Sequence, residues 1–446
     1  MNLTYIALLI FGVGNLLWLL FGIGWPSLVI LLALTFIPGV TPNEVFAHSF
    51  GHQTVIFLLF TFILSGQLRE TGVLRRLIFR FLGLKWAQKS FFHRSVLYAA
   101  AVFTVGSFVA PTVNFLLFYA FMEELCEVAG YEKGSAEGHI LMGLTACLSS
   151  ISCAATPIAH TFPLMAMNYY EAQSGAVLSH GEYFRFAFPL GLLLAIACYL
   201  LLWFYHRRNI DLDDRATQER IDRWLNQDEQ PLSSRAKISA LVFVLVLAAW
   251  LVPAFVPPLN DIVRPWGQAW PAIIGVLILA IVRVGGEAVL NLQHAFKEHV
   301  HYGSLLICAA ALALGYYMAL PELGVTQFVS ELLLPRLGGL SIALLLALLG
   351  IVTISMTNVL SNLVTTTLMS QITLPLLLEI APMWAALGAI VIGFSASLAF
   401  ALPPSIAHIA IAGGSGWTTV RTQAKVGTVL ALGSMIFLSI ALFLTV

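Results

Sequence analysis

The sequence predicts an all-α, polytopic membrane protein, and three observations support this. Of its 446 residues, 59% are hydrophobic and only 10% are charged, whereas a soluble domain carries roughly 25% charged residues. Apolar runs of about 20 residues, long enough to cross a bilayer, recur along the chain. Several of these runs contain proline and clustered polar residues. The number of apolar runs excludes a large soluble helical protein.

The apolar runs predict about ten transmembrane spans. They cover residues 3–20, 23–39, 50–68, 139–168, 184–205, 237–257, 268–284, 301–320, 381–411 and 426–446. The first run has no basic stretch before it and no small-residue cleavage site, which favours a retained span over a signal peptide. Two further stretches, 95–122 and 338–376, are interrupted by polar residues near their middles. We interpret them as re-entrant helical hairpins.

Basic residues set the orientation of the spans, because Lys and Arg gather in cytoplasmic loops. One basic stretch, 69–94, follows the third span and has the pattern of an amphipathic helix on the membrane surface. Another charged stretch, 206–236, is the only long hydrophilic linker. Placing both in the cytoplasm puts both termini on the outer side of a cytoplasmic (inner) membrane.

Four short matches, offset by roughly 250 residues, indicate a duplicated half. They pair Trp25-Pro26 with Trp270-Pro271, segment 67–73 with 319–325, 110–114 with 361–365, and Ile158-Ala159-His160 with Ile406-Ala407-His408. We expect a first half at 1–205, the cytoplasmic linker at 206–236 and a second half at 237–446. Each half crosses the membrane an odd number of times, so the second is inverted relative to the first, as in secondary transporters.

Both hairpins and two spans, 139–168 and 381–411, carry helix-breaking or polar residues at bilayer depth. Broken helix is tolerated there only where it is buried or lines a cavity. Each break exposes a helix N-terminus that attracts anions and carbonyls that can bind a cation. The candidate binding residues are Thr112, Asn114, Thr156, Pro157, His160, Thr161, Ser361, Asn362, Thr365, Thr366, Pro404, Ser405 and His408. Ser361 and Asn362 are also candidate Na+ ligands.

The alternative is that Pro and Thr only kink ordinary spans, but four segments that match two by two favour a site. His160 and His408 occupy matching positions. An intramembrane His can be a packing residue, yet ionisable groups at this depth are generally functional. A neutral imidazole would donate to a substrate carboxylate, whereas its protonation would couple transport to H+. The sequence leaves both roles open.

Several other functions are excluded. The formal net charge is zero, so there is no basic field for nucleic acid. The five cysteines lie singly, and no Cys or His spacing suggests zinc. Catalytic and nucleotide-binding motifs are absent, so we expect no enzyme and no cofactor beyond Na+ or H+ as a coupling ion. The favoured function is secondary active transport of a small anion, a carboxylate, dicarboxylate or oxyanion. The alternatives are a metalloid oxyanion exporter, a substrate-gated channel or a membrane enzyme.

The segment Ser361-Asn362-Leu363-Val364-Thr365-Thr366 resembles the second Ser-Asn-Thr hairpin motif of the divalent anion/sodium symporters. These are the INDY-type dicarboxylate transporters of the ion transporter superfamily. Residues 397–403 with Gly413-Gly414-Ser415-Gly416 are similar to the region of that family's second broken helix. The first hairpin has Ala110-Pro111-Thr112 in place of Ser-Asn-Thr, which marks a divergent member. The resemblance implies a homodimer, elevator-like movement of the hairpins and broken helices, and carboxylate or sulfate substrates.

Overall fold

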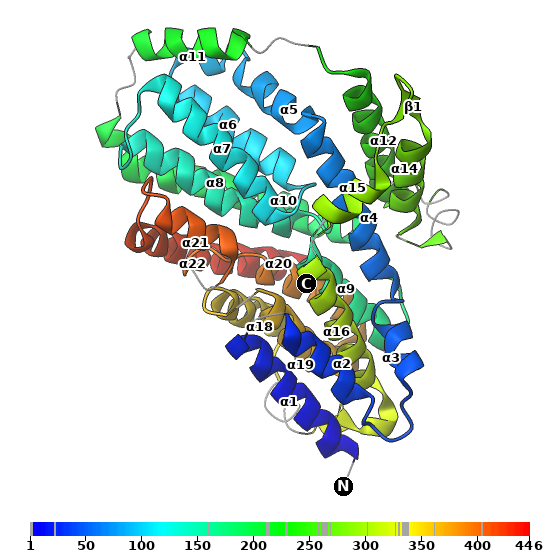
Figure 1. The fold of residues 1–446 in the computed structure, drawn as a ribbon. Coiled ribbons are helices and arrows are strands. Elements are labelled where there is room, and N and C mark those ends of the chain that lie inside the picture. Colours follow the sequence, from blue (N-terminus) through cyan, green and yellow to red (C-terminus); the bar gives the residue numbers. More distant parts are fainter. Residues whose placement is uncertain are drawn as a thin grey trace.

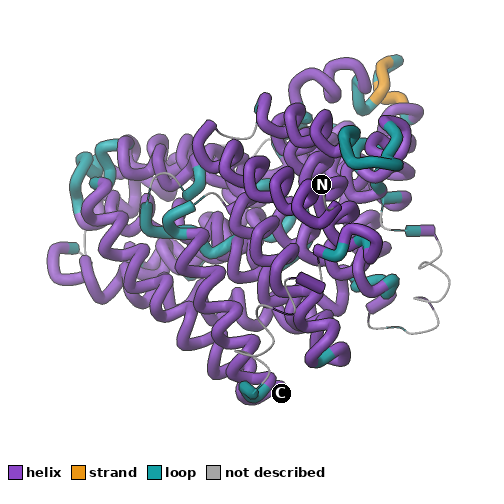
Figure 2. The backbone as a smooth tube through the Cα atoms, turned by 90° about the horizontal axis from the view of Figure 1, so that it is seen from below, coloured by secondary structure: helices purple, strands orange, loops and turns teal. Residues whose placement is uncertain are grey.

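The protein is built almost entirely from helices, with one short β-hairpin (Figures 1 and 2). The structure is a computed structural model. It describes residues 3–21, 24–158, 160–210, 215–227, 231–254, 256, 259, 266–267, 269–300, 302–325, 327–328, 331, 339–360, 362–402 and 405–446. Ser361 and Pro404 of the candidate site lie outside these residues.

The N-terminal part of the chain, up to the predicted linker, contains helices at every predicted span. Its elements are α1 Leu3–Phe21, α2 Trp25–Leu34, α3 Pro42–His48, α4 Gln53–Glu70, α5 Val73–Leu82, η1 Ala87–Lys89, α6 Phe91–Gly106, α7 Pro111–Ala129, α8 Ala136–Ala155, α9 Thr161–Ser174, α10 His180–His206 and η2 Arg207–Asn209. The span predicted to end at 168 continues to Ser174, where Gly175 adopts a φ of 68° and ends α9.

The C-terminal part also places helices at the predicted spans. Its elements are α11 Arg215–Gln227, α12 Ser234–Leu251, η3 Val252–Ala254, α14 Trp270–Ile281, β1 Arg283–Val284, β2 Glu287–Ala288, α15 Leu292–Glu298, α16 Tyr302–Ala319, η5 Pro321–Leu323, α18 Ile342–Thr357, α19 Asn362–Ile380, η6 Pro382–Trp384, α20 Ala385–Ala396, α21 Ala407–Gly414 and α22 Val420–Thr445. The β-hairpin was not predicted. Gly285 and Gly286 form its turn with positive φ angles of 65° and 88°.

Several helices are suited to a bilayer by length and composition. Among the described residues, α8, α10, α19 and α22 are each long and apolar enough to cross a membrane. The bent pair of α3 and α4, with 50° between its helices, also passes as one span, and further apolar helices have 10–17 residues. The all-α, polytopic class is therefore confirmed, while the number of about ten spans stays a prediction.

The helices stop at all four predicted breaks. Residues 107–110 separate α6 from α7, and residues 156–160 separate α8 from α9. In the second half, 358–361 separate α18 from α19, and 397–406 separate α20 from α21. Pro111 occupies the first position of α7, where its missing N–H would have had no helical partner. The breaks therefore create helix N-termini at α7, α9, α19 and α21.

The two parts of the chain pack reciprocally around these breaks. Helix α9 packs against α19 and α20, and α21 packs against α7 and α8. Figure 1 shows α21 and α22 lying next to α8. The contacts are close, because a Cβ on Gly393 would lie 2.8 Å from Pro163 Cα and one on Gly138 would lie 2.6 Å from Trp417 Cε3. The opposite membrane orientation of the two halves stays a prediction.

The two charged stretches contain amphipathic helices. Helix α5 buries Leu74, Ile78 and Phe79 and exposes Arg75 and Arg80. In the predicted linker, α11 packs against α7. There Arg220 Nη2 donates to the Ala129 oxygen at 2.8 Å and Nε donates to the Val128 oxygen at 3.3 Å. Arg220 thus satisfies carbonyls at the C-terminus of α7.

Candidate functional site

The first hairpin is tied to the first broken helix by buried polar contacts. Thr156 Oγ1 donates a short hydrogen bond to the Ser107 oxygen at the hairpin break. Asn114, on α7, donates through Nδ2 to Ser149 Oγ at 3.0 Å and to the Val102 oxygen at 3.3 Å. Both side chains are fully buried. Two predicted site residues, Thr156 and Asn114, therefore stabilise the hairpin against α8.

The second hairpin is tied to the second broken helix by Asn358, which was not among the predicted site residues. Its Nδ2 donates to the Leu398 oxygen and to the Ile354 oxygen, each at 2.9 Å. Its Oδ1 accepts from the N–H groups of Phe400 at 2.8 Å and Ala401 at 3.0 Å. One amide thereby satisfies three backbone groups of the unwound segment.

Side chains from two other helices bond two further carbonyls of this segment. Ser150 on α8 donates to the Ala399 oxygen at 2.8 Å. Gln423 on α22 donates to the Phe400 oxygen at 2.9 Å. The carbonyls of 398, 399 and 400 all accept side-chain hydrogen bonds. This break is consequently a well-bonded junction between helices of both halves.

His408 joins the same junction. Its Nε2 lies 3.0 Å from Ser150 Oγ, and its ring stacks on Phe115 of α7 with centroids 5.6 Å apart. The residue is fully buried, so its ring fills space between α7 and α8. Ser405 bonds locally, donating from Oγ to the Leu402 oxygen at 2.6 Å. The structure thus brings one of the two matched histidines into contact with both hairpin and broken helix of the first half.

A second group of predicted residues has polar atoms without protein partners. Within the described part of the chain, neither ring nitrogen of His160 makes a hydrogen bond, although the ring lies near the backbone of Gly106 and Ser107. The same holds for both amide atoms of Asn362, the Thr365 hydroxyl and the Ser395 hydroxyl. Each of these residues is at most 1% exposed. Buried polar groups rarely lack partners, so these atoms mark a place for a ligand or water.

These unpartnered residues come from three helices in mutual contact. His160 precedes α9, Asn362 and Thr365 belong to the first turn of α19, and Ser395 lies near the end of α20. Helix α9 packs on both α19 and α20, and Gly393 lies against Pro163 at the start of α9. We refer to His160, Asn362, Thr365 and Ser395 as the open cluster.

The other predicted residues contribute less directly. The Thr366 hydroxyl donates to the Asn362 oxygen of its own helix at 2.7 Å. Pro157 and Thr161 are buried beside His160, and Thr112 is half-buried on α7. Among the described residues, Arg94 is the one buried Lys, Arg, Asp or Glu, and it lies at the start of α6. Charge at the breaks must therefore be balanced by helix dipoles, hydroxyls, amides and imidazoles.

Helices that stop at buried breaks within an apolar, polytopic helical fold are typical of membrane transporters. The solved structure of the YdaH transporter of Alcanivorax borkumensis has a similar fold, with a TM-score of 0.55, 14% identity and coverage of 89% of this chain and 88% of that one. MtrF of Neisseria gonorrhoeae, described with a class of antimetabolite efflux pumps, gives a TM-score of 0.57 and 15% identity over 90% of this chain and 83% of that one.

Sequence comparison gives the family. The family model for citrate transporters, CitMHS, matches residues 6–402, so the chain belongs to this family. An uncharacterized transporter of Methanocaldococcus jannaschii, MJ0672, is 27% identical over 270 residues. That match covers 59% of this chain and 56% of the relative. The predicted resemblance to a family of anion transporters is confirmed, and the protein is a multi-pass membrane transporter rather than an enzyme.

Proposed function

We propose that this protein is a secondary active transporter of a small carboxylate anion, coupled to Na+ or H+, that works by an elevator-type mechanism. The observation that carries the proposal is the open cluster. It lies where the N-termini of α9 and α19 begin, and its polar atoms have no partners among the described residues. A helix N-terminus offers unpaired N–H groups and the positive end of the helix dipole.

The chemistry of the open cluster suits a carboxylate. A neutral imidazole on His160 donates one hydrogen bond, and the Asn362 amide and the hydroxyls of Thr365 and Ser395 can donate more. No buried Lys or Arg, within the described residues, lies at the breaks to bind the anion permanently. Binding through dipoles and hydrogen bonds is strong enough to select an anion, and the absence of a fixed ion pair aids its release.

The same cluster offers a place for the coupling ion. The Asn362 amide oxygen and the Thr365 hydroxyl are hard oxygen ligands of the kind that Na+ sites use in transporters. Protonation of His160 would supply H+ coupling at the same place. We therefore propose that Asn362 and Thr365, together with the predicted ligand Ser361, form a Na+ site.

The proposal for movement follows from the ties described above. Hairpins and broken helices are joined by Thr156, Asn358 and Ser150, so we expect them to move as one body against the remaining helices. We further propose a homodimer, as the resemblance to INDY-type transporters implies. We also propose that it lies in the cytoplasmic (inner) membrane with both termini outside, as the distribution of basic residues indicates.

Uptake into proteoliposomes tests the proposal. Purified protein would be offered citrate, dicarboxylates and sulfate, each with a Na+ gradient, a pH gradient or neither. We expect accumulation of at least one carboxylate that depends on one of the two gradients, and no accumulation in protein-free vesicles. Failure of every carboxylate to accumulate under either gradient would reject the proposed function.

A further inference from the structure

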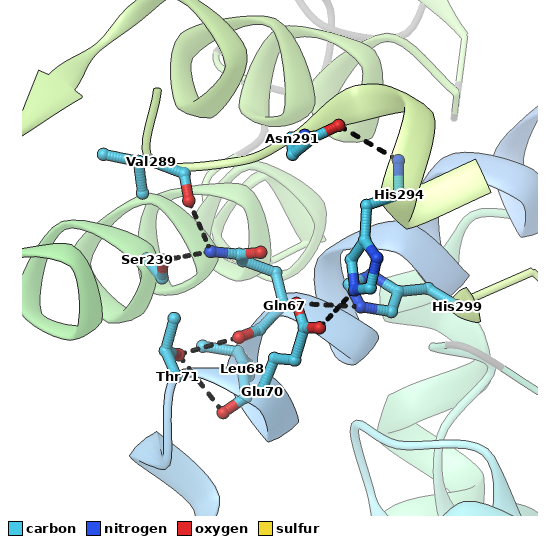
Figure 3. A network of polar contacts seen from close by, with 9 residues as sticks. All are labelled: Gln67, Leu68, Glu70, Thr71, Ser239, Val289, Asn291, His294 and His299. Carbon is cyan, nitrogen blue, oxygen red and sulfur yellow. Dashed lines mark hydrogen bonds and ion pairs between the residues drawn. The ribbon is translucent and has the colours of Figure 1, made fainter. Parts of the chain in front are cut away.

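A polar cavity lies away from the breaks, beside the end of α4. Its volume is about 1060 Å³, and residues of α4, α15, the β-hairpin and the segment before α12 line it. Glu70 and His294 are both part of its wall. Figure 3 shows that His299 lies next to them, so that three side chains with metal-binding atoms point toward one another.

The three side chains are close enough to share one ion. Glu70 Oε1 makes a short contact with His294 Nε2, and Glu70 Oε2 lies 3.2 Å from His299 Nε2. One ligand atom from each residue lies within 4.8 Å of the other two. The imidazole rings are nearly perpendicular, with centroids 5.8 Å apart. Ligand atoms on a tetrahedral Zn2+ are separated by roughly 3.3 Å, as follows from metal–ligand distances near 2.1 Å.

The surrounding residues hold these groups in position. A Cβ on Gly66 would lie 2.2 Å from the His299 ring, so only glycine allows the ring to lie against α4. The Asn291 side chain accepts from the His294 N–H at 3.0 Å and fixes the start of α15. Gln67 donates to the Val289 oxygen at 2.9 Å, which ties α4 to the β-hairpin. Such preorganisation is what a metal site requires.

We propose that Glu70, His294 and His299 form a binding site for a divalent transition-metal ion of the zinc type. Two imidazoles and one carboxylate are a known ligand set for Zn2+, and the fourth position stays open. Here the open position would face the polar cavity.

A bound ion would act as a cross-link inside the chain. Glu70 and His294 are 224 residues apart, and they belong to the first and second predicted halves. The alternative is a plain hydrogen-bonded Glu–His cluster that excludes metal. A metal site and a hydrogen-bonded cluster can be distinguished by two measurements. Only a metal site retains about one ion per chain, and only a metal site gives bound Co2+ an ordered nitrogen and oxygen coordination.

The test uses the full-length protein, purified in detergent with a tag that contains no histidine. After metal removal, Zn2+ would be added, excess removed, and the bound metal measured by mass spectrometry, with Co2+ absorption as a second readout. We expect about one Zn2+ per chain. His294→Ala, His299→Ala and Glu70→Gln should each weaken binding by about tenfold or more, given that even outer-shell partners account for ~10–100-fold in affinity.

His93→Ala is the matched control, because His93 is a half-buried histidine that bonds to Ser90 Oγ at 2.7 Å, away from the cavity. It should bind Zn2+ as the unmodified protein does. Equal Zn2+ retention by all five proteins, or none by the unmodified protein, would overturn the proposal. Each variant is checked for a monodisperse elution profile, and Glu70→Gln, which keeps the shape of the side chain, remains informative if a His variant fails to fold.

Discussion

The break between α20 and α21 and the open cluster both contain buried polar groups. The hydrogen-bonding groups of the break have protein partners, whereas several of those in the open cluster do not. At 398–401, Asn358, Ser150 and Gln423 bond the unwound backbone from three helices. His160, Asn362, Thr365 and Ser395 have free polar atoms among the described residues. His408 contacts Ser150 through Nε2, although its Nδ1 has no hydrogen bond among the described residues, and neither ring nitrogen of His160 has one there. Positions that the predicted repeat pairs therefore differ in how their side chains are hydrogen-bonded, and we propose that only His160 belongs to the binding site.

Replacing Asn358 should have the largest effect. Asn358→Ala leaves the N–H groups of Phe400 and Ala401 without partners, and each buried unpaired group costs ~1–3 kcal/mol. We expect a loss of about 2–6 kcal/mol in stability, measured as a drop in melting temperature in detergent. The matched control is Asn362→Ala, whose amide has no partner among the described residues; it should lower the melting temperature less than Asn358→Ala does and lose transport. Equal melting temperatures for the two variants would contradict the comparison.

The histidines give the next largest contrast. His408→Ala removes a buried ring that stacks on Phe115 and bonds Ser150, so we expect ~2 kcal/mol or more of destabilisation. His160→Ala also empties a buried site, but it should cost less stability because no hydrogen bond among the described residues is lost. We expect it to reduce the transport rate about tenfold, the equivalent of ~1.4 kcal/mol. Melting curves and initial uptake rates on the same preparations would be compared. A stable His408 variant together with an unstable His160 variant would reverse the assignment.

Two adjacent threonines sharpen the comparison within one helix. Thr365→Val removes a hydroxyl that has no partner within the described part of the chain, whereas Thr366→Val removes one that bonds inside α19. In the proposed site the Thr365 hydroxyl bonds the substrate or the coupling ion. Losing that bond, worth ~0.5–1.5 kcal/mol, should slow uptake about threefold to tenfold. Thr366→Val should transport at nearly the normal rate. Indistinguishable uptake rates would remove Thr365 from the site.

The smallest effect is expected at Gln423, which supports the break between α20 and α21. Gln423→Leu keeps the size of the side chain but leaves the Phe400 oxygen without its 2.9 Å donor. Unfolding should become easier by about 1 kcal/mol, less than for Asn358→Ala, because one acceptor is affected rather than two donors. A larger loss than in Asn358→Ala would show that Gln423, on α22, is the main support of the break.

The helices and their breaks were predictable because both depend on local sequence. Apolar runs set the spans, and residues such as Pro111 and Pro157 mark where a helix cannot continue. The supporting side chains were not predictable in the same way. Asn358 lies 42 residues from Phe400, and Ser150 lies 258 residues from His408, so only the tertiary fold shows these pairs. In sequence, a polar residue whose side chain bonds the backbone cannot be told apart from one whose side chain has no protein partner.

The metal ligands were missed for a related reason. Zinc sites are recognised in sequence by short ligand spacings, and Glu70 is separated from His294 by 224 residues. The β-hairpin beside them had a usable signal, because Gly285-Gly286 is a typical two-residue turn. It was overlooked because the preceding apolar run was extended to 284.

The contact between Arg220 and the end of α7 has a practical consequence. These bonds fasten α11 to the end of α7. If the proposed mechanism displaces the hairpin, α11 should therefore move with it. Glu219 is exposed on α11, and all five native cysteines are buried. A fluorophore on Glu219→Cys would therefore report the proposed movement of the hairpin from a residue outside the open cluster.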